Sequence, residues 1–541
     1  LFSIYSNISP LQFDHTFYRS NHDEINVFLS NYDIIKIEPW LKSATETDFD
    51  NDIYLNRIYR ITFSEKSKSN ILEAFDELKT ISDVQYVERE NRHKIYYTPN
   101  DSQYGQQWFL PQINANTAWD FWDFNGNNTP GDKNVLLASV DTGVDWDHPD
   151  LRANIWNNLG EDLDGDGQTI IQSGGSWIFD PDDINFIDDD GNGYIDDFIG
   201  WDCSGFSGSQ DNDPMPPDGV NNGGTWAHGT HVAGLLSANT DNNTGIASAS
   251  FNCSIMSVKV STGEQDYPYI THGYNGILYA SQAGHDAGNY TIINNSWGGL
   301  GYSLYEQATI NIAHEDYGAI VLAAGGNGGG SWDLNTNEFA HYPSSYENVI
   351  SVCPLGNGDS WNNWATYHHS IDLASPGENI RSCTNPSSYQ SWDGSSMASP
   401  VAASVFGLVK SQHMDWTNEM IKTMVLATAD PIIYDVNSEN YLEGMLGTGR
   451  VDTYKAIQTP LFPKIDYAGE DIYILNDTDG NINPGEQIEL SVVLVNDPLW
   501  GTALNSSGFL VSLNSDVTIA NPNVNFGNIE PGEVGINIES P

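Results

Sequence analysis

Three short, glycine-flanked motifs carry a carboxylate, an imidazole and a hydroxyl. Asp141 opens "DTGVDWDHPDL", His228 lies in "WAHGTHVAG" and Ser396 lies in "WDGSSMASP". A serine hydroxyl becomes a nucleophile when a base takes its proton, and the base needs a carboxylate to orient it. Taken singly, Asp141 could cap a turn, His228 could be a core histidine and Ser396 could cap a helix. Their combination predicts catalysis by a serine nucleophile.

The elements expected around these residues form an α/β fold. Near-continuous apolar runs predict buried parallel strands at 134–140, 255–260, 290–296 and 319–325. Helix-like runs alternate with them at 231–238 and 273–284, which predicts a doubly wound, mainly parallel sheet. Asp141 is then expected at the carboxyl end of a strand, where α/β sites usually lie. Ser396 is expected at a helix N-terminus, whose dipole favours a developing anion.

These motifs resemble a known family. "DTG" with "HPDL", "HGTHVAG" and "GSSMASP" are similar to the motifs of subtilisin-type serine proteases, the subtilases, over about residues 105–460. Ser395 stands where that family usually has Thr. The resemblance implies a triad of Asp141, His228 and Ser396 that cleaves peptide bonds through an acyl-enzyme.

The resemblance also implies residues that hold the substrate. Asn327, in "LAAGGNGGG", would donate its side-chain amide to the oxyanion. A protein or peptide substrate would bind as an added strand, with the side chain before the cut in a pocket. The residues expected to line this strand and pocket are Ser296, Trp297, Gly298, Ala324, Gly325, Gly326 and His341. The small walls of the pocket favour large apolar side chains.

The chain is expected to hold three domains, at residues 1–98, 99–460 and 461–541. Residues 1–98 carry a β-α-β pattern and more than half of the Lys and Arg residues. They resemble the small α+β propeptides that assist folding, inhibit subtilases and are then removed. The cut is expected between Tyr97 and Gln106, and a permanent accessory domain is the alternative. Residues 461–541 alternate in period two and predict a β-sandwich that is possibly incomplete.

The net charge of −53 limits the partners. Such a chain repels nucleic acid and anionic membranes and attracts divalent cations. Salt-rich surroundings and many calcium sites both explain the excess of acidic residues, and charge alone does not choose between them. No apolar stretch approaches 18 residues, so no membrane insertion is expected. We expect a secreted, extracellular monomer whose export signal has been removed or omitted.

Alternating acidic residues predict several structural calcium sites. "NFIDDDGNGYIDDFIGWD" has the alternation of an EF-hand loop, but Ile199 occupies the last position, which is normally a bidentate Glu, and Asp197 could substitute. A solvated acidic turn is the alternative. The candidate ligands are Asp188, Asp190, Asn192, Tyr194, Asp196 and Asp197 in this loop, Asp162, Asp164, Asp166 and Gln168 in an earlier loop, Asp211 and Asp213 in a third, and Asp477, Asp479, Asn481 and Glu486 near the C-terminus.

The four cysteines have no CxxC spacing and form an even set. In a secreted chain this favours two disulfides, with Cys203–Cys253 and Cys353–Cys383 as the preferred pairs, and four buried free thiols as the alternative.

The function that these features favour is a calcium-stabilised serine endopeptidase made as a zymogen. A chain that stays latent under residues 1–98 is one alternative. A calcium-dependent binding protein on an inactive protease fold is another, and a missing triad residue would support it. No triad residue is missing.

Overall fold

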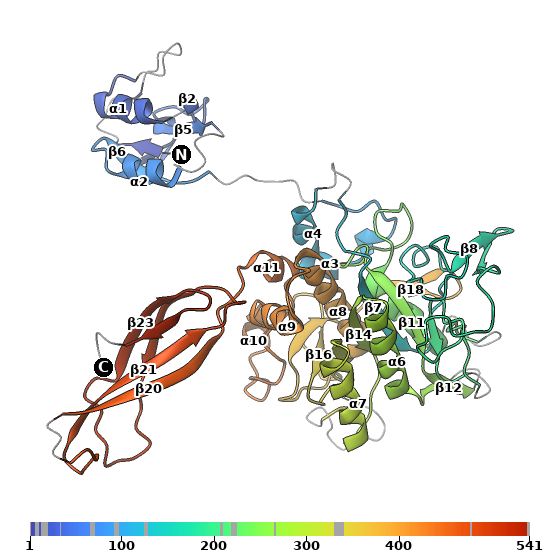
Figure 1. Cartoon of the computed structure of the whole chain (residues 1–541). Coiled ribbons are helices and arrows are strands. Elements are labelled where there is room, and N and C mark those ends of the chain that lie inside the picture. The colour runs from blue at the N-terminus through green and yellow to red at the C-terminus, as the bar shows by residue number, and fades with distance from the viewer. Residues whose placement is uncertain are drawn as a thin grey trace. The chain divides into compact units, whose positions relative to one another are not determined.

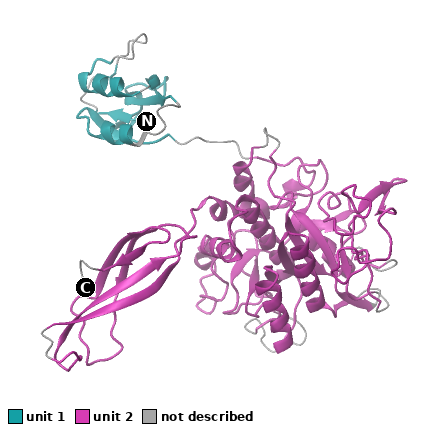
Figure 2. Cartoon of the chain, in the orientation of Figure 1, with its two compact units in different colours: residues 1–95 teal, residues 96–541 magenta. Residues whose placement is uncertain are grey.

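The computed structural model of the chain describes residues 2–537, except for 6–9, 12–19, 33, 65–70, 91–96, 124–127, 206–208, 218–223, 265–266, 329–339 and 476–478. The structure separates into two compact units, residues 1–95 and 96–541 (Figure 2). No helix in these described ranges is long and apolar enough to cross a membrane.

The first unit is a small α+β fold. Its antiparallel sheet has the order β2-β5-β1-β6, and its core includes Phe2, Phe28 and Tyr59. The elements are β1 (Phe2–Ile4), α1 (Asp23–Asn31), β2 (Ile34–Pro39), β3 (Phe49–Asp50), β4 (Ile53–Tyr54), β5 (Ile58–Phe63), α2 (Ile71–Lys79) and β6 (Val84–Val87). The strand-helix-strand pattern expected from the sequence corresponds to β5, α2 and β6, whereas β1, α1 and β2 were not foreseen.

A seven-stranded sheet forms the centre of the second unit. The strands pair in parallel in the order β10-β11-β7-β14-β15-β16-β17, which confirms the predicted parallel sheet. They are β7 (Val135–Asp141), β10 (Gly200–Asp202), β11 (Ser254–Lys259), β14 (Tyr290–Asn295), β15 (Ile320–Ala324), β16 (Val349–Leu355) and β17 (Leu373–Pro376). After β7 the chain forms β10 and β11 on one side of it, and then β14 to β17 on the other side. The direction in which strands are added to the sheet therefore reverses beside β7. Such a reversal opens a crevice at the carboxyl ends of the strands.

Helices cover both faces of this sheet (Figure 1). Successive side chains of a strand point to opposite faces, so the apolar side chains of each strand contact helices on both sides. Leu137 of β7 packs in one core cluster with α5 (His228–Ser237) and α8 (Ser395–Gln412). Leu136 and Ala138 pack in another cluster with α6 (Gly273–Asp286) and α7 (Leu304–Glu315). The β7 strand is therefore buried on both sides, as its near-continuous apolar sequence predicts.

Shorter elements surround this core. The helices are α3 (Phe109–Gln112), α4 (Ala115–Ala118), α9 (Asn418–Ala427), α10 (Ile432–Val436) and α11 (Thr453–Gln458). Three antiparallel pairs are β8 (Ile170–Ser173) with β9 (Ser176–Phe179), β12 (Ser261–Glu264) with β13 (Tyr267–Ile270), and β18 (Ile380–Thr384) with β19 (Ser388–Trp392).

The C-terminal segment is built of antiparallel strands. They are β20 (Ile465–Leu475), β21 (Gln487–Asn496), β22 (Ala503–Phe509), β23 (Asn523–Ile529) and β24 (Val534–Ile536). Two sheets result, β20-β21-β24 and β22-β23. The expected strands are therefore present, and their packing as a sandwich, possibly an incomplete one, stays a prediction.

The segment from residue 97 to 106 is packed against the rest of the second unit. The Tyr97 ring contacts the Trp119 ring, with centroids 6.4 Å apart. Asp101 is buried and accepts a hydrogen bond from the backbone N–H of Asp241 at 2.8 Å. The backbone N–H of Gln103 donates to the carbonyl of Gly245 at 2.7 Å. The segment with the expected cut is therefore held against its own unit, although five of its ten residues, Thr98, Asn100, Ser102, Gly105 and Gln106, are exposed.

The predicted disulfides are also wrong, because all four cysteines are buried free thiols. Cys203 follows β10 while Cys253 precedes β11, and these strands run parallel with Asp202 opposite Lys259. The two thiols therefore lie at opposite ends of β11, about 20 Å apart at roughly 3.3 Å per residue. A disulfide needs Cα atoms closer than about 7 Å.

The other proposed pair fails for a different reason, since its two cysteines belong to different core clusters. Cys353 packs with Leu355 and Ile371, whereas Cys383 packs with Val144 and Ala233. Both thiols are completely buried among apolar side chains. They fill space in the core.

Candidate active site

Asp141 and His228 meet where β7 ends and α5 begins. Asp141 is the last residue of β7 and His228 the first of α5, and the His228 Nδ1 to Asp141 Oδ1 distance is 2.7 Å. The close approach depends on Gly229, since a Cβ there would lie 2.3 Å from the carbonyl oxygen of Gly143. The backbone N–H of Gly229 also donates to the Thr142 hydroxyl at 2.9 Å. The helix start is thus held against the strand end.

The Asp141 carboxylate is buried, and the His228 side chain is about one-quarter exposed. Burial acts to lower the pKa of His228, but the charge of Asp141 and its hydrogen bond outweigh it. The pKa of His228 therefore lies above its ordinary value of 6.5. Asp141 also accepts from the backbone N–H of Thr142 at 2.7 Å, which fixes its orientation. The carboxylate is placed to stabilise a protonated His228.

The raised pKa predicts the pH dependence of activity. A base must be neutral to accept a proton, so kcat/KM should fall with acidification through a midpoint above pH 6.5. Asp141→Asn removes the charge that raises this pKa, so the midpoint of its residual activity should move to lower pH. The measurement is kcat/KM on a chromogenic peptide against pH at constant ionic strength. A wild-type midpoint below 6.5 would contradict this electrostatic role of Asp141.

Ser396 is the second residue of α8, where the first backbone N–H groups have no partner within the helix. Its hydroxyl donates to the carbonyl of Ser296 at 3.0 Å. The Ser296 hydroxyl donates in turn to the carbonyl of Ser396 at 2.8 Å. Within the described residues no hydrogen bond joins Ser396 to His228. Rotation about the Cα–Cβ bond of Ser396 redirects its hydroxyl, and catalytic hydrogen bonds are often incomplete in substrate-free structures.

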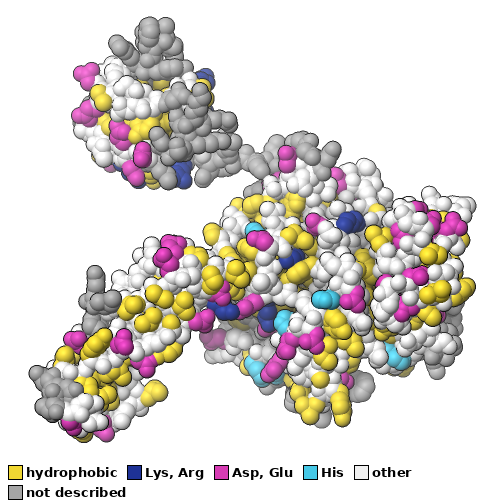
Figure 3. Space-filling model, viewed as in Figure 1, with side chains coloured by type: hydrophobic (Ala, Val, Ile, Leu, Met, Phe, Trp, Pro, Cys, Tyr) yellow, Lys and Arg dark blue, Asp and Glu magenta, His cyan; other side chains and the backbone are white. Residues whose placement is uncertain are grey.

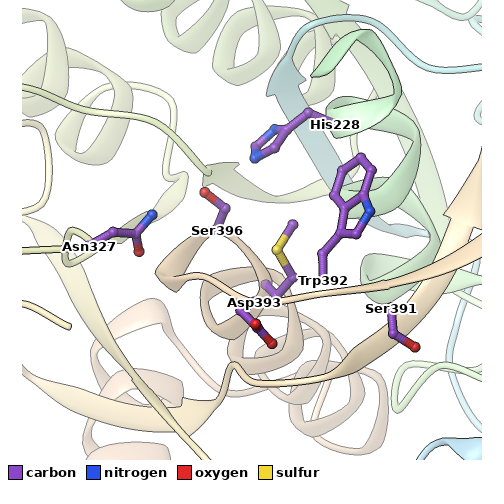
Figure 4. Close-up of a pocket in the computed structure, with 7 residues that line it drawn as sticks. His228, Asn327, Ser391, Trp392, Asp393 and Ser396 are labelled. Carbon is purple, nitrogen blue, oxygen red and sulfur yellow. The ribbon is translucent and has the colours of Figure 1, made fainter. Parts of the chain in front are cut away.

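One pocket contains three of the four predicted catalytic side chains. It has a volume of about 480 Å³ and is lined by His228, Asn327, Ser391, Trp392, Asp393, Ser396 and Met397. Figure 4 shows the Ser396 hydroxyl between the His228 ring and the Asn327 amide. Asp141 is buried behind His228 and does not line the pocket. A hydroxyl, an imidazole and an amide thus face one space.

The orientation of Asn327 is set by Ser395. The Asn327 Oδ1 atom accepts from both the backbone N–H and the hydroxyl of Ser395, each at 2.8 Å. The Ser395 hydroxyl also accepts from the backbone N–H of Gly326 at 3.2 Å. Because these contacts take the amide oxygen, the amide NH₂ group is directed to the other side, toward Ser396 (Figure 4). The serine that replaces the usual Thr therefore positions the predicted oxyanion donor.

Trp392 is a pocket residue that sequence reasoning missed. Its indole stacks on the His231 ring, with centroids 4.5 Å apart and planes 3° from parallel, and its centroid lies 6.3 Å from that of His228. Burial, aided by the charge of His228, lowers the pKa of His231 to about 3, so this histidine is neutral. Only its position four residues before Ser396 could have drawn attention to Trp392.

The three segments that were predicted to form the substrate pocket meet in the structure: the one with Gly298, the one with Gly326 and the one with His341. A Cβ on Gly298 would lie 2.6 Å from the His341 ring, and one on Gly326 would lie 3.2 Å from it. The Trp297 indole N–H donates to the carbonyl of Val140 at 2.8 Å, so its ring packs inward against α6. The remaining predicted residues, Ser296, Ala324 and Gly325, are buried, and each lies within two positions of Gly298 or Gly326 along the chain. None of the seven belongs to the described 480 Å³ pocket.

The acidic loops form two groups of carboxylates in the described part of the chain. Asp162, Asp164 and Asp166 make one group, as predicted for the earlier loop. The other combines Asp190 and Asp197 with Glu161, which was not a predicted ligand. Chain spacing could not have identified Glu161, because it lies 29 residues from Asp190 in sequence.

The other predicted ligands join neither group. Asp188 accepts from the backbone N–H groups of Gly191 and Gly193, and Asp196 accepts from those of Asn185 and Phe186. Asp477 lies outside the described residues. Asn192 contacts the second group, because its side-chain amide donates to Asp190 and Asp197 at 3.1 and 3.0 Å. The remaining candidates, which belong to neither carboxylate group, are Tyr194, Gln168, Asp211, Asp213, Asp479, Asn481 and Glu486.

The chain is similar in sequence to several known proteases. The chain is 30% identical over 395 residues to the halolysin-like extracellular serine protease Nep of Natrialba magadii, covering 73% of this chain and 58% of that protein. It is 30% identical over 405 residues to halolysin of Haloferax mediterranei, covering 74% and 62%. It is 33% identical over 366 residues to thermitase of Thermoactinomyces vulgaris, covering 67% and 100%. The chain thus spans about three-fifths of the length of the two halolysin relatives.

A solved protease structure from Pseudoalteromonas arctica is similar over 67% of this chain and 99% of that one, with 25% identity and a TM-score of 0.49. The sequence profile of the Subtilase family matches residues 132–453, which include Asp141, His228, Asn327 and Ser396. The chain therefore belongs to the subtilase family.

Proposed function

We propose that the protein is a serine endopeptidase in which Ser396 attacks the peptide carbonyl. His228 takes the Ser396 proton through its Nε2 atom, and Asp141 stabilises the imidazolium through the Nδ1 hydrogen bond. His228 then gives the proton to the departing amine, and water hydrolyses the acyl-enzyme by the same route. The observation that carries this proposal is the 2.7 Å contact between Asp141 and His228 beside a pocket that contains Ser396 and Asn327.

The tetrahedral oxyanion would be stabilised by two donors. One is the side-chain amide of Asn327, whose oxygen is held by Ser395. The other is the backbone N–H of Ser396 at the start of α8, where the helix dipole favours negative charge. Donors that are already oriented toward a developing charge lower the barrier without further reorganisation.

The substrates would be extended protein segments with a large apolar residue before the cut. The segment from Ser296 to Gly298 would pair with the peptide backbone. Gly298 and Gly326 lie directly against the His341 ring, an approach that a side chain at either position would prevent. Burial lowers the pKa of His341, so it would be neutral and suited to an apolar neighbour.

Secretion and synthesis as a zymogen fit the remaining features. The relative Nep, which is named an extracellular protease, supports export. The first unit is compact by itself, which is compatible with a removable inhibitor. Because residues 97–106 belong to the second unit and pack against the rest of it, we place the cut before Tyr97. We also propose that the C-terminal strands form an accessory sandwich.

We further propose that bound calcium stabilises the catalytic unit. The acidic loops offer carboxylate and amide oxygens, which are the ligands that calcium prefers. Figure 3 shows Asp and Glu side chains spread over the visible face with few Lys and Arg side chains among them. Divalent cations would reduce repulsion where these carboxylates gather.

The test is labelling by a fluorophosphonate, which reacts with an activated serine. We expect the chain to be labelled after processing and Ser396→Ala to remain unlabelled. Ser395→Ala is the matched control, because it removes the neighbouring hydroxyl and should still be labelled. Absence of label on the processed wild type would reject the proposed activity. Absence of label on the uncut chain alone would indicate latency under residues 1–98.

A further inference from the structure

We propose that Glu161, Asp190 and Asp197 bind one calcium ion between two loops. An EF-hand loop has a Glu ligand at its last position, where this chain has Ile199. Glu161, from another loop, would supply the missing carboxylate. The inference deepens the proposed calcium stabilisation and rests on it. The ion would lie between the loop that contains Glu161 and the loop that contains Asp190 and Asp197. Its ligands would thus come from two loops and not from one continuous loop.

The geometry of the three carboxylates suits one ion. One oxygen from each of Glu161, Asp190 and Asp197 lies within 4.8 Å of the others. Oxygens bound to the same calcium at about 2.4 Å lie at most about 4.8 Å apart. Like charges this close repel unless a cation or protons separate them. Within the described residues, no Lys, Arg or His forms an ion pair with any of the three.

Glu161 provides a second, independent indication of a ligand. Its side chain is completely buried, with no exposed surface. The Oε1 atom accepts from the backbone N–H groups of Asp189 and Asp190, at 3.0 and 3.2 Å. The Oε2 atom is buried and has no hydrogen-bond partner among the described residues. A buried carboxylate oxygen without a partner is costly, and a bound cation removes that cost.

The neighbouring donors hold the other two carboxylates in place. Asp197 accepts from the Tyr279 hydroxyl at 2.6 Å and from the Asn158 amide at 2.8 Å. The same Asn158 amide donates to Asp190 at 2.9 Å. All of these donors are neutral, so they orient the carboxylates without neutralising their charge. Such supporting contacts are typical of a built metal site.

The test is calcium titration of the full-length Ser396→Ala chain by calorimetry after chelation, since this background prevents self-digestion. Glu161→Gln keeps the size of the side chain and an oxygen for the two backbone donors, but removes the charge. We expect it to lose one bound ion per chain, or to bind that ion at least about tenfold more weakly. The matched control is Asp189→Asn, since Asp189 is an exposed neighbour that accepts only from Asn185 among the described residues. It should bind as the parent does.

Terbium luminescence excited through tyrosine provides a second readout in the parent chain, which stays informative if Glu161→Gln fails to fold. Tyr279 donates to Asp197 and its ring contacts that of Tyr194, so terbium bound here should luminesce, and Tyr279→Phe should weaken the signal. Calcium should displace the terbium.

Two results would overturn the assignment: unchanged calcium stoichiometry and affinity in Glu161→Gln, or terbium luminescence that Tyr279→Phe leaves unchanged. A parent chain that binds no calcium would instead reject calcium stabilisation as a whole.

Discussion

Ser396→Ala is expected to lower kcat on a peptide substrate by about 10⁶-fold, because the acyl-enzyme can no longer form. This magnitude comes from a member of the same family. His228→Ala should cost about as much, and the double substitution should cost little more than either alone. The reason is that the nucleophile and the base act as one unit. The measurement is kcat at saturating substrate, with circular dichroism to verify the fold.

The same substitution also tests self-processing. If the proposed cut before Tyr97 is made by the protease itself, the Ser396→Ala chain should stay at full length while the wild type loses its first unit. The N-terminal sequence of the wild-type product gives the position of the cut. Efficient cleavage of the Ser396→Ala chain expressed alone would show that another protease processes it. Retention of more than about one-hundredth of wild-type kcat would exclude Ser396 as the nucleophile.

Asn327→Ala is expected to lower kcat by about 10²–10³-fold with little change in KM. This range also comes from the same family. The loss arises because the Asn327 amide would bind the oxyanion of the transition state more strongly than the carbonyl of the bound substrate. Steady-state kinetics separate the two parameters. An equal loss through KM, with kcat preserved, would assign Asn327 to ground-state binding.

Ser395 provides the matched controls for this prediction. Ser395→Ala removes one of the two hydrogen bonds to Asn327 Oδ1 and leaves the backbone N–H contact. We therefore expect a smaller loss of kcat than in Asn327→Ala. Ser395→Thr restores the usual residue of the family and keeps a hydroxyl, so it should retain activity. If Ser395→Ala were as damaging in an Asn327→Ala background as alone, Ser395 would act independently of Asn327.

Much of the catalytic fold follows from local sequence. The apolar run that predicted a buried strand at 134–140 is β7, which is buried on both faces. The helix predicted at 231–238 is part of α5, which begins three residues earlier at His228. Buried parallel strands and glycine-flanked turns are specified by neighbouring residues, so pattern reading finds them. Helix boundaries are less certain from sequence because caps are short and varied.

Long-range pairing was not predictable in the same way. The cysteine count suggested disulfides, but strand direction places Cys203 and Cys253 at opposite ends of β11. The segment after Tyr97 has a polar sequence, yet its residues bind the loop at 241–245. Composition describes single segments, whereas these outcomes depend on which segments the sheet brings together.

The sequence by itself determined the family motifs, the order of the strands along the chain and the proposed roles of Asp141, His228 and Ser396. Each role depends on a residue type within a short glycine-flanked motif. Only the tertiary structure decided that Asp141 and His228, 87 positions apart, come within 2.7 Å. It likewise brought Glu161 to Asp190 and Asp197. Such contacts depend on the folding of distant segments, since a buried carboxylate finds its partners through the packing of loops and not through their spacing along the chain.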